Sequence, residues 1–140
     1  LPEERGVYRK MRVAEFLEAF PEAQFVMHEV DFGQIASSVP SAPMWYGRPI
    51  EAPRAPDRLL HDGDTLEVAG HSFEAIHAPG HTPGSVCLYN AEGDGVVFTG
   101  DVLFAGSIGR SDFPGGDHAT LIAPPNAAWP GRFPSWRAGQ

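Results

Sequence analysis

The first regular pattern of hydrophobic positions runs from Val13 to Phe20. Its apolar residues recur with the i, i+3, i+4, i+7 spacing of one helix face. Pro21 ends this pattern, and the apolar segment from Gln24 to His28 then predicts a short buried strand. A helix followed by a strand predicts a layered α/β (α+β) fold rather than an all-β barrel.

Proline is concentrated between Pro40 and Pro56. Because proline is excluded from central strands and helix interiors, this segment is predicted to be a loop. Within it, Trp45 and Tyr46 show no periodicity. We interpret them as packing residues, with a place in a substrate cleft as the alternative.

Beyond Asp57 the pattern changes to short apolar runs separated by turn residues. Strands are predicted over four segments: Thr65–Ala69, Ser72–His77, Ser85–Tyr89 and Val96–Phe98. The intervening pairs, such as Pro79-Gly80, readily adopt the backbone angles of tight turns, so the spacing predicts an antiparallel meander. The last two segments are almost wholly apolar, and we expect them to be the more deeply buried.

The end of the chain combines a predicted helix start with a segment rich in proline and glycine. Asp117 precedes HATLIA and predicts an N-capped helix, which Pro124 and Pro125 end. Residues 124–140 are expected to be poorly ordered. Residues 1–12 and 118–140 both carry more basic than acidic residues, so the negative charge of the chain lies between its two ends.

Composition narrows the classes of protein. At 140 residues the chain is long enough for a single domain with a core, and its formal net charge of -8 argues against nucleic acid as a partner. Because no apolar run approaches the roughly 18 residues of a membrane span, we expect a cytoplasmic protein with no membrane partner. The single cysteine, Cys87, lies in an apolar run and is predicted to be a buried hydrophobic residue rather than a nucleophile.

Two candidate metal-binding residues lie in loops, one between two of the predicted strands and one after the last predicted strand. His81 stands in the turn GHTPGS, and Asp101 stands in TGD directly after the segment that ends at Phe98. An imidazole and a carboxylate held by rigid strand ends are suitable ligands for zinc, iron or manganese. The alternative is that both residues only form hydrogen bonds within their own turns.

The segments GHTPGS, TGDVLFAGSIGR and PGGDH together resemble the second half of the metallo-β-lactamase superfamily, most closely its glyoxalase II-like (hydroxyacylglutathione hydrolase-like) enzymes. The resemblance covers roughly Val13 to Ile122. It implies a partial αββα sandwich and a centre of one or two metal ions, with zinc expected and iron or manganese as alternatives. It also implies hydrolysis of a small-molecule thioester such as an acylglutathione, in which a metal-held hydroxide attacks the carbonyl carbon.

By position, the resemblance makes His81 the histidine that completes the first metal site and Asp101 the carboxylate that bridges both metals. No catalytic residue is implied beyond these ligands. Ser107 and Arg110 in GSIGR are placed on the substrate side, and an ion pair of Arg110 with a nearby aspartate, Asp112 or Asp117, is the alternative.

The other histidines are not expected to bind metal. His77 corresponds to a non-ligand position of the family, so we interpret it as structural. The remaining four are interpreted as surface or loop residues: His28, His61, His71 and His118.

Two ligand segments of the family have no counterpart in this sequence. Its His-x-His-x-Asp-His motif is expected before Val13, where the chain reads GVYRKMR, and its Pro-Gly-His-Gly motif is expected in the segment PPNAAWPGRFPSWRAGQ. We therefore expect residues 1–140 to form a single incomplete domain with a family-like core at 13–122. Residues 1–12 and 124–140 are expected to be atypical, poorly ordered ends, and our hypothesis is that unrelated sequence replaced the original ends through truncation or a shifted reading frame. Such a domain is expected to bind zinc weakly and to self-associate through uncovered strands.

Two further interpretations remain open beside an impaired thioester hydrolase. The first is a non-catalytic fragment of such a domain. The second is a protein like the iron-dependent persulfide dioxygenases, whose loops also resemble GRSDF and which would use iron. A serine hydrolase is disfavoured because Ser85 does not lie in a G-x-S-x-G turn.

Overall fold

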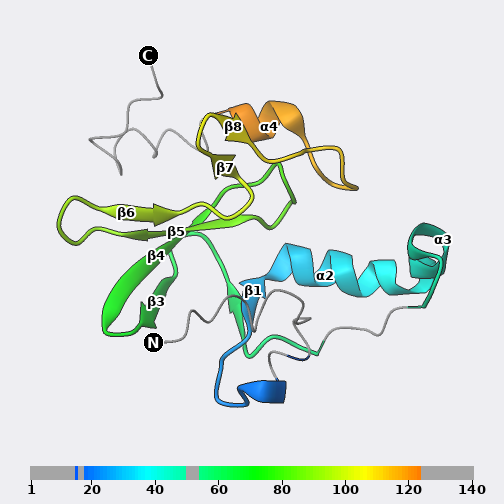
Figure 1. The fold of residues 1–140 in the computed structure, drawn as a ribbon, viewed down its shortest axis with the longest axis horizontal. Coiled ribbons are helices and arrows are strands. Elements are labelled where there is room, and N and C mark those ends of the chain that lie inside the picture. Colours follow the sequence, from blue (N-terminus) through cyan, green and yellow to red (C-terminus); the bar gives the residue numbers. More distant parts are fainter. Residues whose placement is uncertain (1–14, 16–17, 50–53, 124–140) are drawn as a thin grey trace, which may run out of the picture.

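A four-stranded antiparallel sheet forms the centre of the fold in a computed structural model, which describes residue 15 and residues 18–49 and 54–123 (Figure 1). The strands follow one another along the chain in the order β3 (Thr65–Val68), β4 (His71–His77), β5 (Val86–Asn90) and β6 (Val96–Phe98). The register places Ala75 of β4 opposite Leu88 of β5. The predicted meander is therefore confirmed, with strand ends shifted by one residue at most.

A smaller parallel pair lies beside this sheet. Strand β1 (Val26–His28) pairs with β2 (Arg58–Leu60), and His28 is opposite Leu60. The predicted strand at Gln24–His28 is thus confirmed over its last three residues. Strand β2 was not predicted, because only the five residues 57–61 separate the proline-rich segment from the next turn at Asp62-Gly63.

Helix α2 (Glu29–Ser38) follows β1 directly and was not predicted. Phe32, Ile35 and Ala36, with Val39 just after the helix, have the i, i+3, i+4, i+7 spacing of one helix face, so the sequence did hold a signal for α2 that our prediction missed. None of the residues of α2 is fully buried. Its N-cap is His28, whose side chain accepts a hydrogen bond from the backbone N–H of Val30. In Figure 1 the helix extends away from the sheet.

The proline-rich segment is not wholly a loop, which corrects the prediction for Pro40–Pro56. It begins with a 3-10 turn, η1 (Val39–Ser41), and continues as the short helix α3 (Ala42–Tyr46). Pro43 lies in the first turn of α3, where a backbone N–H has no helical partner in any case. Residues 50–53 lie outside the described part of the chain, and so does most of the helix predicted from Val13 to Phe20, although Glu15, Glu18 and Ala19 are helical.

A small hairpin and a one-turn helix complete the described chain. The hairpin consists of β7 (Leu103–Phe104) and β8 (Ser107–Ile108). Helix α4 (His118–Ile122) begins as predicted at Asp117, whose carboxylate accepts a hydrogen bond of 2.6 Å from the N–H of Thr120. The segments 1–12 and 124–140, predicted to be atypical, lie outside the described residues.

The hydrophobic core joins the central sheet to α4 and to the loop after β6. Its buried members are Ile76, Ala78, Cys87, Val102 and Leu121. Cys87 is completely buried, which confirms its prediction as a core residue. Burial raises the pKa of its thiol to about 11, because the thiolate would lose its hydration there.

Strand β6 is less buried than its apolar sequence predicted. Val96 is 52% exposed and Phe98 is 58% exposed. Within the described chain β6 pairs only with β5, so it forms one edge of the sheet. Apolar composition by itself did not determine depth here, because depth depends on a layer that covers the strand.

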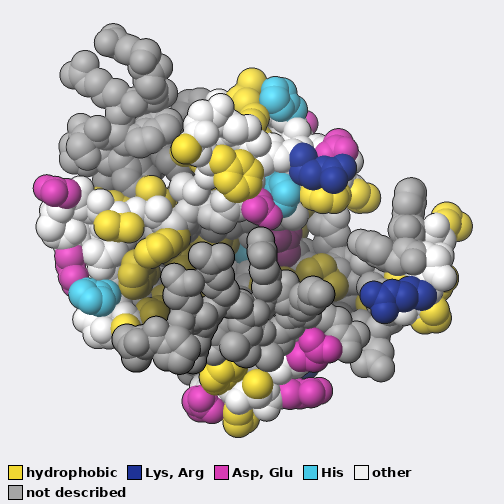
Figure 2. Space-filling view, viewed as in Figure 1, with side chains coloured by type: hydrophobic (Ala, Val, Ile, Leu, Met, Phe, Trp, Pro, Cys, Tyr) yellow, Lys and Arg dark blue, Asp and Glu magenta, His cyan; other side chains and the backbone are white. Residues whose placement is uncertain are grey.

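The mixture of helices and strands confirms the predicted α/β (α+β) class. No helix among the described residues is long and apolar enough to cross a membrane. On the face drawn in Figure 2, acidic side chains lie both at the rim and near the centre, while the basic side chains that this face shows lie apart from one another on the right-hand side.

Candidate functional site

The turn between β4 and β5 presents His81. Three backbone hydrogen bonds close it: from Ala78 N–H to the Ser85 carbonyl at 2.8 Å, from Gly80 N–H to the Thr82 carbonyl at 3.1 Å, and from Ser85 N–H to the Thr82 carbonyl at 3.4 Å. Gly80 has φ +134°, and a β-carbon there would lie 2.5 Å from the Cα of Leu121. Glycine is therefore required both by the backbone angle and by the close approach of α4.

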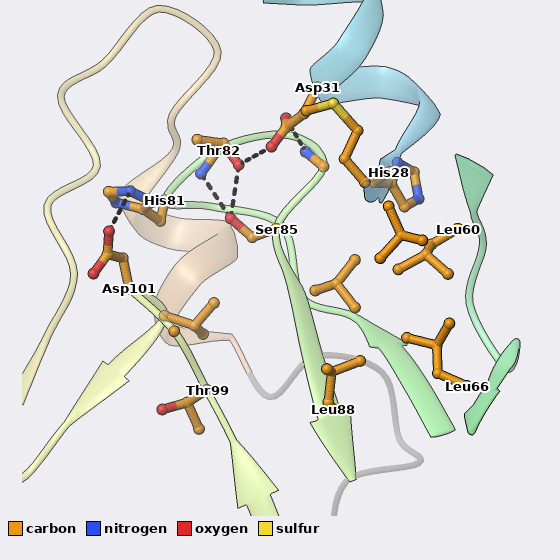
Figure 3. A pocket seen from close by; sticks show the side chains of 16 residues that line it. His28, Asp31, Leu60, Leu66, His81, Thr82, Ser85, Leu88, Thr99 and Asp101 are labelled. Atoms are coloured by element: carbon orange, nitrogen blue, oxygen red, sulfur yellow. Dashed lines mark hydrogen bonds and ion pairs between the residues drawn. The ribbon is translucent and has the colours of Figure 1, made fainter. Parts of the chain in front are cut away.

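His81 and Asp101 come together although they lie on different loops. The distance from His81 Nε2 to Asp101 Oδ2 is 3.6 Å (Figure 3). The His81 side chain is 15% exposed, whereas that of Asp101 is 68% exposed. The two candidate ligands are therefore neighbours in space, and their role as metal ligands stays a prediction.

The orientation of the His81 ring is fixed by the backbone. Its Nδ1 lies 2.7 Å from the carbonyl oxygen of Arg110. A carbonyl oxygen only accepts hydrogen bonds, so Nδ1 carries the proton and the lone pair of a neutral ring is on Nε2. The edge of the ring also contacts Phe113, with ring centroids 5.4 Å apart. His81 therefore directs its free nitrogen at the Asp101 carboxylate.

This geometry fits two ligands of one metal ion. Ligand atoms bonded at about 2.1 Å to a tetrahedral ion stand about 3.4 Å apart, close to the separation of His81 Nε2 and Asp101 Oδ2. A neutral Nε2 and a carboxylate both offer lone pairs, and a metal cation between them would be bound by both. Among the described residues, however, no three His, Cys, Asp or Glu side chains are grouped to hold a metal ion. The described residues fit part of a metal site and not a complete one.

Arg110 uses its side chain within its own loop. Its guanidinium forms two hydrogen bonds of 2.6 Å with Asp112 and lies over the Phe113 ring, 4.3 Å from the centroid. This ion pair lowers the pKa of Asp112 to about 2. Of the alternatives for Arg110, the structure thus contains the ion pair with Asp112. Ser107 is exposed and donates a weak 3.4 Å hydrogen bond to the Ile108 carbonyl. A substrate-side role for Ser107 and Arg110 stays a prediction.

The histidines outside the turn differ in their burial. His28 was predicted to be a surface or loop residue, which is wrong: it is only 6% exposed, because β1 and α2 join at this residue and its ring packs against His77. His77 has a structural contact, since its Nε2 donates a 2.7 Å hydrogen bond to the Pro83 carbonyl. The other three are exposed, as predicted: His61, His71 and His118.

Asp31 of α2 is a site residue that the sequence did not indicate. Its carboxylate accepts hydrogen bonds of 2.6 Å from the Thr82 hydroxyl and from the Gly84 N–H. These partners lie 51 and 53 residues away in the chain. Because α2 itself was not predicted, no local signal marked this carboxylate.

A pocket of about 390 Å³ opens beside His81 and Asp101. Figure 3 shows the two characters of its wall, with Asp31, His81, Thr82 and Asp101 on one side and leucines on the other. The apolar wall comes from β1, β2, β3 and β5 and includes Leu60, Leu66 and Leu88. The pocket therefore joins a pair of candidate ligands to an apolar surface that could contact the carbon chain of a small molecule.

Comparison with known proteins places the sequence among metallo-hydrolases. A family model described as the metallo-beta-lactamase superfamily matches residues 4–132. The hydroxyacylglutathione hydrolase GloC of Haemophilus influenzae is 46% identical over 87 residues, which cover 61% of this chain and 41% of that protein. The probable metallo-hydrolase YqgX of Bacillus subtilis is 42% identical over 76 residues, which cover 54% and 36%.

Two solved structures are similar in fold. A crystal structure of the BLEG-1 B3 metallo-beta-lactamase has a TM-score of 0.63 and 35% identity, covering 77% of this chain and 51% of that one. A crystal structure of TTHA1623 in a di-iron-bound form has a TM-score of 0.60 and 39% identity, covering 79% and 52%. The chain spans about half or less of the length of each of these four proteins.

Proposed function

The chain belongs to the metallo-beta-lactamase superfamily, and from this premise we propose that it derives from a metal-dependent hydrolase of small thioesters of the acylglutathione type. Its fold is part of the metallo-beta-lactamase fold, in agreement with the predicted partial sandwich. The substrate class is supported by the similarity to GloC, which is named as a hydroxyacylglutathione hydrolase.

The observation that carries this proposal is the pairing of His81 with Asp101. The Arg110 carbonyl holds the proton of His81 on Nδ1, which leaves Nε2 free to bind a metal beside the Asp101 carboxylate. When bound, a metal ion in such a site supplies a Lewis acid and activates water. The residues of this chain would hold the ion and fix the direction of the imidazole. An imidazole nitrogen and a carboxylate oxygen are suitable ligand atoms for zinc, and iron or manganese are alternatives.

We propose as the second candidate a non-catalytic fragment of the same kind of domain. It is favoured by the lack of a third grouped ligand among the described residues. A site with two protein ligands binds zinc far more weakly than a complete one. A cytoplasmic location remains part of the proposal, and so does the absence of nucleic acid and membrane among the partners.

Zinc titration by calorimetry tests the ligand assignment. We expect binding weaker than micromolar in the wild-type chain and none in His81→Ala or Asp101→Asn. The control is His71→Ala, because His71 is exposed and pairs with Glu92 away from the site. Zinc binding that is unchanged by His81→Ala contradicts the assignment, whereas submicromolar binding in the wild type shows that further ligands take part.

Assays with defined substrates separate the candidate functions. The hydrolase is supported if the chain cleaves the thioester bond of a hydroxyacylglutathione in a metal-dependent reaction and if His81→Ala abolishes that cleavage. Zinc binding without hydrolysis supports the non-catalytic fragment. Oxygen consumption with a glutathione persulfide and ferrous iron supports the persulfide dioxygenase alternative.

A further inference from the structure

Helix α2 holds the turn that carries His81, although the two are far apart in sequence. The two carboxylate oxygens of Asp31 have different partners: Oδ2 accepts the hydrogen bond of the Thr82 hydroxyl, and Oδ1 accepts that of the Gly84 N–H. Both distances are 2.6 Å, and Asp31 is half-buried. Hydrogen bonds to an ionised acceptor are about twice as strong as those between neutral groups.

The close approach of Asp31 explains why residue 84 is glycine. A β-carbon at Gly84 would lie 2.7 Å from the Asp31 Cγ, a distance that would force the two segments apart. Unlike Gly80, Gly84 does not have a positive φ. Glycine is required at this position of GHTPGS because the α2 carboxylate approaches closely, and not because of the backbone angle.

The hydrogen bonds continue from Asp31 through Thr82 to Ser85, the residue directly before β5. The Thr82 hydroxyl also contacts the Ser85 hydroxyl at 2.8 Å, and the Thr82 N–H donates to that same oxygen at 3.0 Å (Figure 3). Because Thr82 directly follows His81, these hydrogen bonds fix the orientation of the peptide bond between the two residues. A small rotation of this peptide would move the imidazole away from the Arg110 carbonyl and from Asp101.

We propose that Asp31 is a positioning residue for His81. By holding Thr82 and Gly84, it keeps the imidazole where Nδ1 donates to the Arg110 carbonyl and Nε2 faces Asp101. That this positioning matters for metal binding rests on the proposed function. The effect of Asp31 on the orientation of the His81 ring does not rest on it, because that effect is expected in the metal-free protein.

The experiment is nuclear magnetic resonance of metal-free protein labelled with ¹⁵N and ¹³C at histidine, which reports the tautomer of each ring. In the wild type, His81 is expected to carry its proton predominantly on Nδ1. In Asp31→Ala, we expect a large loss of this bias. Asp31→Asn is expected to restore most of it, because the amide oxygen accepts from Gly84 and the amide nitrogen donates to the Thr82 hydroxyl.

A matched control separates positioning from stability. Asp64 also accepts a backbone hydrogen bond, from the His61 N–H at 2.9 Å, and it does not contact the turn. Asp64→Ala should lower the urea midpoint without a change in the His81 tautomer. The proposal is overturned if folded Asp31→Ala keeps the wild-type tautomer, or if Asp64→Ala disturbs His81 as much as Asp31→Ala does.

A second variant covers the case in which Asp31→Ala does not fold. Thr82→Val keeps the side-chain shape and removes only the hydroxyl, so a smaller shift of the tautomer in the same direction is expected. An unaltered His81 ring in folded Thr82→Val overturns the proposal. Addition of zinc to the wild type then tests the proposed function separately, because an unresponsive His81 contradicts the metal site and leaves the tautomer result in place.

Discussion

His28 and His77 are stacked, with ring centroids 4.3 Å apart and ring planes inclined by 13°. Each ring stabilises a different segment near the site. His28 Nδ1 accepts from the Val30 N–H and caps α2, while His77 Nε2 donates to the Pro83 carbonyl in the turn that carries His81. The stacked pair therefore connects the start of α2 to that turn, in addition to the contacts of Asp31.

The stability of the fold is predicted to decrease at mildly acidic pH because of His28. Burial lowers the pKa of His28, and the neighbouring His77 lowers it further, against the opposing influence of Glu29 and Asp31. The unfolded chain then binds a proton more tightly than the folded one. This contribution to stability is complete above the ordinary histidine pKa of about 6.5 and is lost as pH falls through the lowered pKa.

Urea unfolding between about pH 5 and pH 8 checks this prediction. His28→Asn keeps a good N-cap and cannot titrate, so its midpoint should depend less on pH than that of the wild type. His28→Ala should lose about 1 kcal/mol at pH 8, because it removes the cap. An equal pH dependence in His28→Asn and the wild type would contradict the role of His28.

Two glycines are predicted to respond to alanine with opposite signs. Gly80→Ala combines an unfavourable φ with a contact of 2.5 Å to Leu121, so a loss of about 2 kcal/mol or more in unfolding free energy is expected. Gly33 is exposed within α2 and has free space around it. Gly33→Ala should therefore stabilise the protein by about 0.5–1 kcal/mol. Paired thermal and urea denaturation measures both, and equal effects would contradict the packing of α4 on the turn.

The Cys87 thiol is predicted to be unreactive in the folded protein. It is fully buried, and its raised pKa leaves almost no thiolate at neutral pH. A thiol reagent such as Ellman's reagent should label it only after urea unfolds the core. Rapid labelling in native buffer would show that the sheet and α4 separate easily around this residue.

We propose that a second copy of the chain pairs with the edge strand β6. Val96 and Phe98 are exposed on this strand, whose outer edge has no partner strand within the described chain. Val96→Lys should lower the apparent mass at high protein concentration, because a charged side chain opposes strand pairing. Ile122→Lys is the control, since Ile122 is also an exposed apolar residue (59%, against 52% for Val96) but lies at the end of α4. Light scattering coupled to gel filtration measures the mass, and a concentration-independent monomer in the wild type would contradict this proposal.

The sequence by itself determined the local features of this protein. Alternating apolar residues and turn pairs predicted the meander from β3 to β6, because strand periodicity and turn chemistry depend on residues within a few positions of one another. The same turns placed His81 and Asp101 at strand ends. The N-cap at Asp117 and the burial of Cys87 were also local predictions, and the structure confirms them.

Only the tertiary structure decided which distant groups meet. Asp31 reaches the His81 turn across about fifty residues, and the apolar spacing within α2 can predict the helix but not the turn that its carboxylate contacts. The burial of His28 and the exposure of β6 likewise depend on which segments pack against them. A hydrogen bond or a covering layer between remote segments leaves no periodic trace in the chain. The direction of the His81 ring, set by the carbonyl of Arg110, is therefore a property of the fold and not of the motif.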